Sequence, residues 1–230
     1  KQAVTRLYSI QVDDQEHIVT DGTTVLGADD KSGTTVMLYM MAKNVPGLYY
    51  FFIGEERGGI GSRALADKYD EVSYLKNIKR CVSFDRRNYH SVITQQMGRV
   101  CCSNDFGTAL CEQYNKNGLN LSLDPTGIYT DSAKFISLVS ECTNISVGYY
   151  GEHGHSEKQD IDHLKKLCKA VCEIDWETLP VSRKMGIDSL YDYDYEDDGD
   201  EDDEDDEDYN NDGDVDDGGR GDVTMPPPSS

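Results

Sequence analysis

Two pairs of adjacent carboxylates are the residues of this chain best suited to chemistry. One pair lies in residues 27–33, GADDKSG, and the other in residues 54–58, GEERG. Each pair directly follows a stretch that predicts a strand, and open α/β sheets place their ligand sites at such strand ends. Converging carboxylates repel each other unless a cation or a shared proton compensates the charge. We therefore predict a metal site at these residues.

Two further segments extend this pattern. Residues 81–85, CVSFD, form a short apolar run that ends in Asp85. Residues 144–150, NISVGYY, predict another strand, and Glu152 and His153 follow it. Four such segments in a set order are far more specific than any one of them alone.

In this order the four segments resemble the co-catalytic zinc aminopeptidases of clan MH, and the chain is also similar to peptidase T. The resemblance implies two zinc ions, with Asp29 as the carboxylate that bridges them. It implies Glu56 and His153 as further ligands of the first zinc and Asp85 as a ligand of the second. It implies Glu55 as the general base and a cis peptide bond after Asp29.

Each of these roles has a chemical reason. Two zinc ions about 3.5–4 Å apart need a bridging oxygen ligand and bring the pKa of a bound water towards about 7. Glu55 would take that proton and return it to the leaving amine. The metals would polarise the scissile carbonyl and stabilise the oxyanion. The resemblance therefore implies hydrolysis of a peptide bond.

The chain departs from this family in one respect. The family has an upstream His-x-Asp motif whose histidine binds the second zinc. The only histidine before Asp29 is His17, and no Asp lies two positions after it. The resemblance covers roughly residues 1–175, and the chain begins at Lys1 without a Met. We therefore expect a catalytic domain that is incomplete at its N-terminus and a second zinc site that lacks one ligand.

Simpler interpretations compete for several of these residues. An isolated pair of carboxylates is most often a solvated turn or a helix N-terminus, where the helix dipole favours negative charge. His155 competes with His153 as the ligand, and the position in the motif favours His153. His90 is interpreted as a surface or loop histidine. Asp131 resembles a Thr-Asp element near the substrate site of related enzymes, and its role stays open.

The charge of the chain is concentrated at its C-terminal end. Of the net charge of −22, residues 188–230 carry −19 and residues 1–187 carry −3. An acidic run of this kind repels itself and buries little apolar surface, so we expect a disordered tail after one domain at 1–187. The tail argues against nucleic-acid binding and allows contact with basic partners. Its residues 208–215 resemble the start of a calcium loop without the final Glu, so only weak calcium binding is expected.

The cysteines and the hydropathy indicate the compartment. Seven cysteines are present, an odd number with no Cys-x-x-Cys pair. This pattern favours reduced cysteines in a cytoplasmic protein over a disulfide framework. No run approaches 18 apolar residues, so we predict no transmembrane helix and no membrane partner.

The remaining pattern predicts the elements that position these residues. Strands are predicted at 4–12, 17–20, 48–53, 80–84 and 143–148. Helices are predicted at 31–42, 61–69, 104–114, 132–139 and 157–174. The run 48–53 is continuously apolar, which favours a central strand over a half-exposed one. Alternating strands and helices predict a single three-layer α/β/α domain with a mostly parallel mixed central sheet.

We therefore expect a zinc-dependent exopeptidase, most simply an aminopeptidase that acts on peptide substrates. A carboxypeptidase or an amidohydrolase would use the same metals and the same water, and these residues do not decide between them. A non-catalytic peptide-binding protein of the same fold is the alternative from another class. The absent upstream histidine favours that alternative, whereas Glu55 counts against it, because a binding protein needs no general base.

Overall fold

In the part of the chain that the structure describes, the central sheet has four strands, with both parallel and antiparallel neighbours. The structure is a computed structural model and describes residues 5–185 of the chain, so the predicted acidic tail and its calcium-loop window lie outside the described residues. The sheet has the order β3 (Arg80–Arg86), β8 (Glu141–Ser146), β4 (Ser91–Ile93) and β7 (Ser122–Asp124). β3 is parallel to β8 and β4 is parallel to β7, whereas β4 and β8 are antiparallel. The prediction of a mostly parallel mixed sheet is confirmed.

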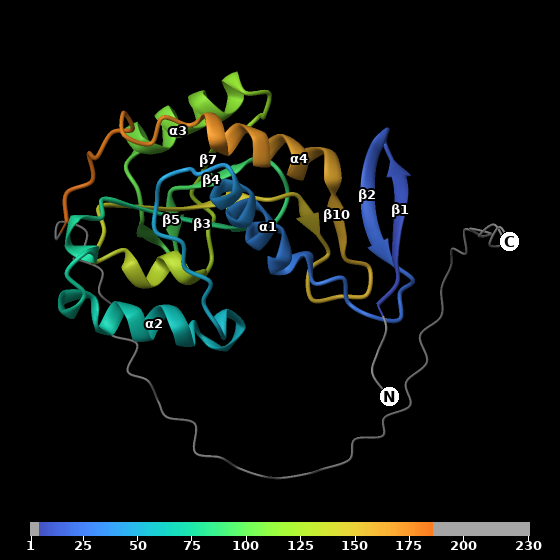
Figure 1. Cartoon of the computed structure of the whole chain (residues 1–230), viewed down its shortest axis with the longest axis horizontal. Coiled ribbons are helices and arrows are strands. Elements are labelled where there is room, and N and C mark those ends of the chain that lie inside the picture. Colours follow the sequence, from blue (N-terminus) through green and yellow to red (C-terminus); the bar gives the residue numbers. More distant parts are fainter. Residues whose placement is uncertain (1–4, 186–230) are drawn as a thin grey trace, which may run out of the picture. The chain divides into compact units, whose positions relative to one another are not determined.

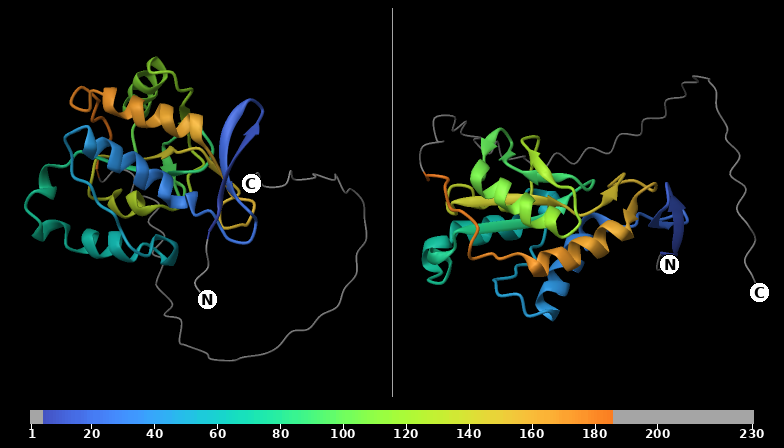
Figure 2. Two further views of the ribbon diagram at one scale, coloured as in Figure 1. Left: turned by 45° about the vertical axis from the view of Figure 1, so that its right-hand side comes forward. Right: turned by 90° about the horizontal axis from the view of Figure 1, so that it is seen from above.

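Helices cover both faces of this sheet, as Figures 1 and 2 show. α1 (Ala28–Ala42), α3 (Asn104–Lys116) and α4 (Ile161–Ala170) share the larger hydrophobic core with the sheet. α2 (Ile60–Asp67) and the 3₁₀ helix η4 (Asp131–Phe135) share a smaller core with it. The predicted three-layer architecture is therefore confirmed. No helix in the described part is both long and apolar enough to cross a membrane.

Residues of β8 illustrate why the sheet forms the middle layer. All six of its residues are buried, as expected of a strand that is covered on both faces. Its Ile145 belongs to the larger core and its Cys142 to the smaller core. Cys142 and the other six cysteines are free, as predicted.

A second sheet joins the first two strands of the described chain to two strands that come much later in the sequence. Its order is β1 (Leu7–Val12), β2 (Gln15–Thr20), β10 (Lys158–Asp160) and β9 (Tyr149–Tyr150), and all neighbours are antiparallel. The two predicted N-terminal strands are thus present and form a hairpin, and β10 pairs with its second strand. This pairing brings the chain before α1 close to the chain between β9 and β10 (Figure 1).

The prediction of a central strand at 48–53 is wrong. None of the described strands pairs with this segment, and β3 is the edge of its sheet. Side chains hold the segment instead. Tyr50 stacks on Phe52 with ring centroids 5.5 Å apart, and Phe52 packs against Phe135 at 6.1 Å. Tyr50 and Phe52 thus pack against the smaller core, whereas Leu48, Phe51 and Ile53 of the same run are exposed, Ile53 to 74%.

Two predicted helices have different bounds in the structure. The helix predicted at 157–174 begins only at Ile161, because 158–160 form β10 and Asp160 ends that strand as the N-cap. The Asp160 carboxylate accepts a hydrogen bond from the N–H of His163 at 2.8 Å, as N-cap residues do. The helix predicted at 132–139 is the short 3₁₀ helix η4. The short elements β5 (Gln95–Gln96), β6 (Arg99–Val100), η1 (Glu55–Arg57), η2 (Tyr69–Glu71), η3 (Leu75–Asn77) and η5 (Val171–Glu173) complete the described chain.

His163 makes the stability of this fold dependent on pH. Its side chain is buried, with Nε2 3.1 Å from the carbonyl oxygen of Ser146, and burial lowers its pKa. Below the ordinary pKa of about 6.5 the unfolded chain binds a proton at this residue more readily than the folded one, so the contribution of His163 to stability falls as pH falls. We expect the urea midpoint of the wild type to fall relative to that of His163→Gln when both are measured from about pH 7 to about pH 5. Parallel pH profiles of the two proteins would contradict this.

Candidate metal centre

The start of α1 presents Asp29. Gly27, before the helix, is left-handed with φ 66° and ψ 36°, and Asp29 has φ −82° and ψ 104°, outside the helical region. The peptide bond between Asp29 and Asp30 is cis, as the resemblance implies. Gly33 allows this end of α1 to lie against β3, because a Cβ atom there would stand 1.8 Å from the carbonyl oxygen of Phe84. The predicted ligand is thus placed beside the end of the strand that carries Asp85.

Glu55 and Glu56 lie in η1, a single turn bounded by glycines. Gly54 and Gly58 have φ of 69° and 77°, a left-handed conformation that glycine adopts at little cost. The N–H of Gly59 donates to the carbonyl oxygen of Gly54 at 3.0 Å and closes the turn. The pattern GEERG therefore encodes a tight turn that presents both carboxylates.

Three of the four predicted metal ligands converge. Nε2 of His153 lies 2.9 Å from Oε1 of Glu56 and 3.0 Å from Oδ2 of Asp29, and the three ligand atoms all lie within 4.8 Å of one another. The side chains of His153 and Glu56 are 63% and 61% exposed, whereas that of Asp29 is 13% exposed. Two carboxylates and one imidazole are a donor set that suits zinc and related divalent cations. The residues present therefore fit a divalent cation that enters from solvent.

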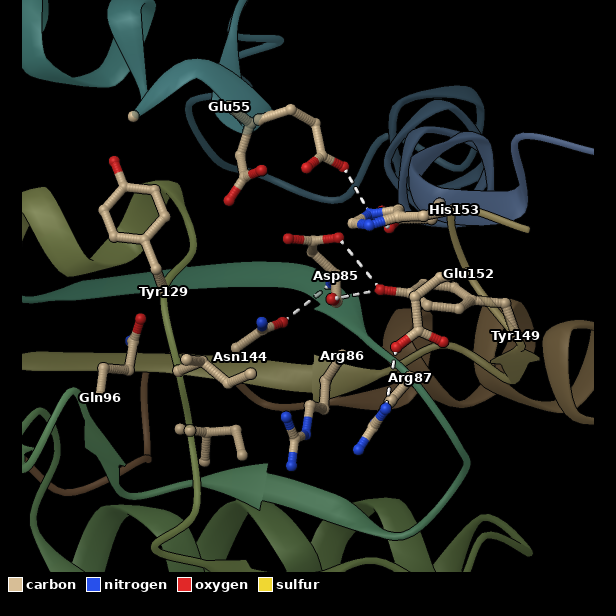
Figure 3. Close-up of a pocket in the computed structure, with 16 residues that line it drawn as sticks. Glu55, Asp85, Arg86, Arg87, Gln96, Tyr129, Asn144, Tyr149, Glu152 and His153 are labelled. Carbon is tan, nitrogen blue, oxygen red and sulfur yellow. Dashed lines mark hydrogen bonds and ion pairs between the residues drawn. The ribbon is translucent and has the colours of Figure 1, made fainter. Parts of the chain in front are cut away.

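Asp85, the fourth predicted ligand, lies in the same cavity but outside this group of three. Its carboxylate accepts a hydrogen bond from the hydroxyl of Thr130 at 2.8 Å. Its backbone N–H donates to the side chain of Asn144 at 2.8 Å, and its carbonyl oxygen accepts from the hydroxyl of Tyr149 at 2.8 Å (Figure 3). Three neighbouring side chains thus hold the end of β3 in place beside Asp29, Glu56 and His153.

Burial and mutual repulsion raise the pKa of three carboxyl groups at this site, Asp29, Asp30 and Asp85. Desolvation, followed by the charge of Asp85, raises the pKa of Asp30 to about 9. Desolvation, with the charge of Asp29 adding to it, raises the pKa of Asp85 to about 8. The pKa of Asp29 is also raised, by desolvation and by the charge of Glu56. Positive charge placed beside these three carboxyl groups would favour their ionised form, which is the electrostatic condition of a cation site.

The pKa values of Glu55 and His153 are both raised, but for different reasons. Desolvation, followed by repulsion from Glu56, raises the pKa of Glu55 to about 7. The charges of Glu56 and Asp29 raise the pKa of His153. The Glu55 side chain lines the cavity without belonging to the group of three ligands (Figure 3). A carboxyl group with a pKa near the working pH is suited to general acid–base catalysis.

The cavity has a volume of ≈ 320 Å³ and a second wall that the sequence did not predict. Arg86, Gln96, Tyr129 and Asn144 lie across it from Glu55 (Figure 3). Arg86 is 3.5 Å from Asp124, and Arg87, which also lines the cavity, is 3.0 Å from Glu152. The signal available in the sequence was the position of the two arginines directly after Asp85.

The other histidines considered in the sequence lie elsewhere. Nδ1 of His155 is 2.7 Å from the carbonyl oxygen of Gly22, so the structure places His153 and not His155 in the cluster. His17 is buried in β2 and does not line the cavity. His90 is exposed, in agreement with its interpretation as a surface histidine. Asp131 lies in η4 and does not line the cavity, although its charge contributes to the raised pKa of Glu55.

Comparison with known proteins identifies solved structures of similar fold. No protein-family model and no curated protein matches the chain. Among solved structures, it is similar to the aminopeptidase PepT from Bacillus cereus, with a TM-score of 0.58, 16% identity, and 73% of this chain and 75% of that chain covered. It is similar to a tripeptidase from Staphylococcus aureus, with a TM-score of 0.54, 16% identity and the same coverage.

The TET1 peptidase of Pyrococcus horikoshii is a third similar structure, with a TM-score of 0.54 and 17% identity. The match covers 73% of this chain and 52% of that chain, so this chain spans about half the length of the TET1 peptidase. At such identities the likeness establishes the fold alone. The chain has the mixed α/β fold of these peptidases.

Proposed function

We propose that this chain is the catalytic domain of a metal-dependent exopeptidase that removes N-terminal residues from peptides. The observation that carries the proposal is the convergence of Asp29, Glu56 and His153 beside Glu55, whose pKa lies at about 7. The fold shared with an aminopeptidase and a tripeptidase supports it. Zinc suits the donor set, because it binds imidazole nitrogen and carboxylate oxygen readily.

Asp29, Glu56 and His153 would hold the first cation, and Asp85 with the shared Asp29 would hold a second. A divalent cation at this position would supply polarisation of the scissile carbonyl and activation of a water molecule. The chain's own contribution begins with the cavity, whose wall opposite Glu55 would hold the substrate at the cluster. Asn144, Thr130 and Tyr149 keep Asp85 in place through the hydrogen bonds described above.

Glu55 would then move the proton. Its carboxylate would accept a proton from the attacking water and donate it to the amine that leaves. A pKa of about 7 leaves a substantial fraction of Glu55 ionised at neutral pH, while its protonated form is acidic enough to complete the transfer. The exposed side chains of Glu56 and His153 leave the cluster open for the α-amino group of a peptide.

One observation favours a carboxypeptidase as the second candidate. Arg86 and Arg87 line the same cavity, and a guanidinium is the side chain best suited to a terminal carboxylate. Both arginines already have acidic partners, Asp124 and Glu152, which weakens this alternative.

A panel of substrates separates these functions. We expect the zinc-loaded protein to hydrolyse aminoacyl 4-nitroanilides with a free α-amino group, and to lose this activity after treatment with a chelator and regain it with zinc. Hydrolysis only of N-acylated dipeptides with a free carboxylate would identify a carboxypeptidase. A protein that binds zinc and peptides but hydrolyses neither set would be a binding protein, and the proposal would be wrong.

A further inference from the structure

Glu157 is a buried carboxylate whose two oxygens bind the loop that carries Asp29. The residue is 1% exposed. Its Oε2 accepts a hydrogen bond from the N–H of Gly27 at 2.6 Å, and its Oε1 accepts one from the N–H of Asp29 at 2.9 Å. Hydrogen bonds to an ionised group are short and roughly twice as strong as those between neutral groups. This side chain therefore holds the loop firmly at two points.

The loop depends on such a partner because its backbone is irregular. Gly27 is left-handed and Asp29 is extended, although α1 follows directly. The first N–H groups of a helix have no acceptor within the helix and must find one elsewhere. For Gly27 and Asp29 the acceptor is Glu157, which lies 130 and 128 positions later in the chain. The direction in which Asp29 leaves the backbone is thus set by a distant side chain.

Glu157 also belongs to the segment that carries His153. His153 lies in the turn between β9 and β10, and Glu157 directly precedes β10. Its N–H donates to the carbonyl oxygen of Gly154 at 3.2 Å, within the same turn. A single side chain thus connects the turn of His153 to the loop of Asp29, and these two residues approach to 3.0 Å.

We propose that Glu157 is a positioning residue that keeps Asp29 and His153 at the separation at which both bind one divalent cation. The inference rests on the proposed function, since it requires a cation at Asp29, Glu56 and His153. Glu157 does not line the cavity, so it acts through the backbone of Asp29 rather than by contact with the cation or the substrate.

The test is the affinity of the metal-free full chain for Co²⁺, together with the visible absorption spectrum of the Co²⁺ form. Glu157→Gln keeps the size of the side chain but turns an amide NH₂ towards an N–H donor. Partners that orient a metal ligand typically contribute about 10–100-fold to metal affinity. We expect Glu157→Gln to bind Co²⁺ at least about 10-fold more weakly than the wild type, with an altered spectrum.

Asp160→Ala is the matched control. Asp160 is also 1% exposed and lies three positions further on, but its carboxylate caps α4 instead of holding the Asp29 loop. We expect this variant to melt at a lower temperature and to bind Co²⁺ with wild-type affinity and spectrum. If Glu157→Gln likewise lowers only the melting temperature, Glu157 is merely structural and the inference is overturned.

A second variant covers the case in which Glu157→Gln does not fold. Glu157→Asp keeps the charge but is one methylene shorter, so it reaches only one of the two N–H groups. We expect an affinity between those of the wild type and the Gln variant, and wild-type affinity would overturn the inference. A wild type that binds no Co²⁺ would refute the proposed function as well, whereas a binding wild type with unaffected Glu157 variants would refute the positioning role alone.

Discussion

Glu55→Gln is expected to lower kcat for aminoacyl 4-nitroanilide hydrolysis about 10²–10⁴-fold while cation binding is retained. Glutamine has nearly the same shape but cannot accept the proton of the attacking water. Glu55 lies outside the group formed by Asp29, Glu56 and His153, so the substitution leaves the predicted ligands of the first cation in place. Steady-state kinetics at saturating zinc, together with a zinc titration of both proteins, would check this result.

An exposed glutamate provides the control for that substitution. Glu71 lies in η2, is exposed and does not line the cavity, so Glu71→Gln is expected to keep wild-type kcat and KM. Glu55→Gln activity within a factor of about 3 of the wild type would rule out Glu55 as the general base, since such a base contributes at least about 10²-fold. Loss of zinc binding in that variant would instead assign Glu55 to the ligands.

Asp29→Asn is expected to separate the stability of the protein from its cation binding. Desolvation and the charge of Glu56 raise the pKa of Asp29, so the ionised carboxylate is unfavourable in the folded, metal-free protein. The neutral amide removes this repulsion, and we expect the metal-free variant to melt no lower than the wild type. Zinc at 100 times its Kd stabilises a protein by about 2.7 kcal/mol. We expect the wild type to gain a shift of this size and the variant to gain almost none.

Thermal melts with zinc and with a chelator, on both proteins, would measure the effect. Asp67→Asn is the control, because Asp67 is exposed in the last turn of α2 and does not belong to the cluster. A zinc-dependent shift of full size in Asp29→Asn would show that the cation binds elsewhere. A lower melting temperature of the metal-free variant would show that Asp29 stabilises the fold even without a cation.

The three groups that converge could be predicted because their segments occur in the order found in the zinc aminopeptidases that the sequence resembles. Local patterns indicated that Asp29 opens a helix and that Glu56 and His153 follow apolar runs, and the resemblance implied that the three residues share one cation. Their residue types then indicate a cation, because carboxylates that converge must be compensated. The start of α1 and the strand β3 could be predicted because the local pattern of apolar residues and glycines indicates them.

Features that depend on tertiary contacts could not be predicted in this way. Residues 48–53 have the composition of a central strand, but pairing requires a neighbour, and hydropathy does not reveal whether one is present. Glu157 reads as the start of an amphipathic helix, yet it precedes a strand and binds a loop 130 residues away. The arginines of the second cavity wall follow Asp85 in the sequence, and only the packing of β3 against β8 places them beside the cluster.

The connection between β2 and β10 has a consequence for how the cation site is made. The contacts within the cation site and between Glu157 and its loop join residues that lie 97, 124 and 130 positions apart. The site therefore belongs to the part of the fold with high contact order. Such contacts form late and slowly, because long loops must close before any stabilising interaction is gained. During synthesis, Asp29 and Glu56 leave the ribosome long before His153 and Glu157 are made. Tight cation binding therefore marks the moment at which the segment of Asp29 and Glu56 has met the segment of His153 and Glu157.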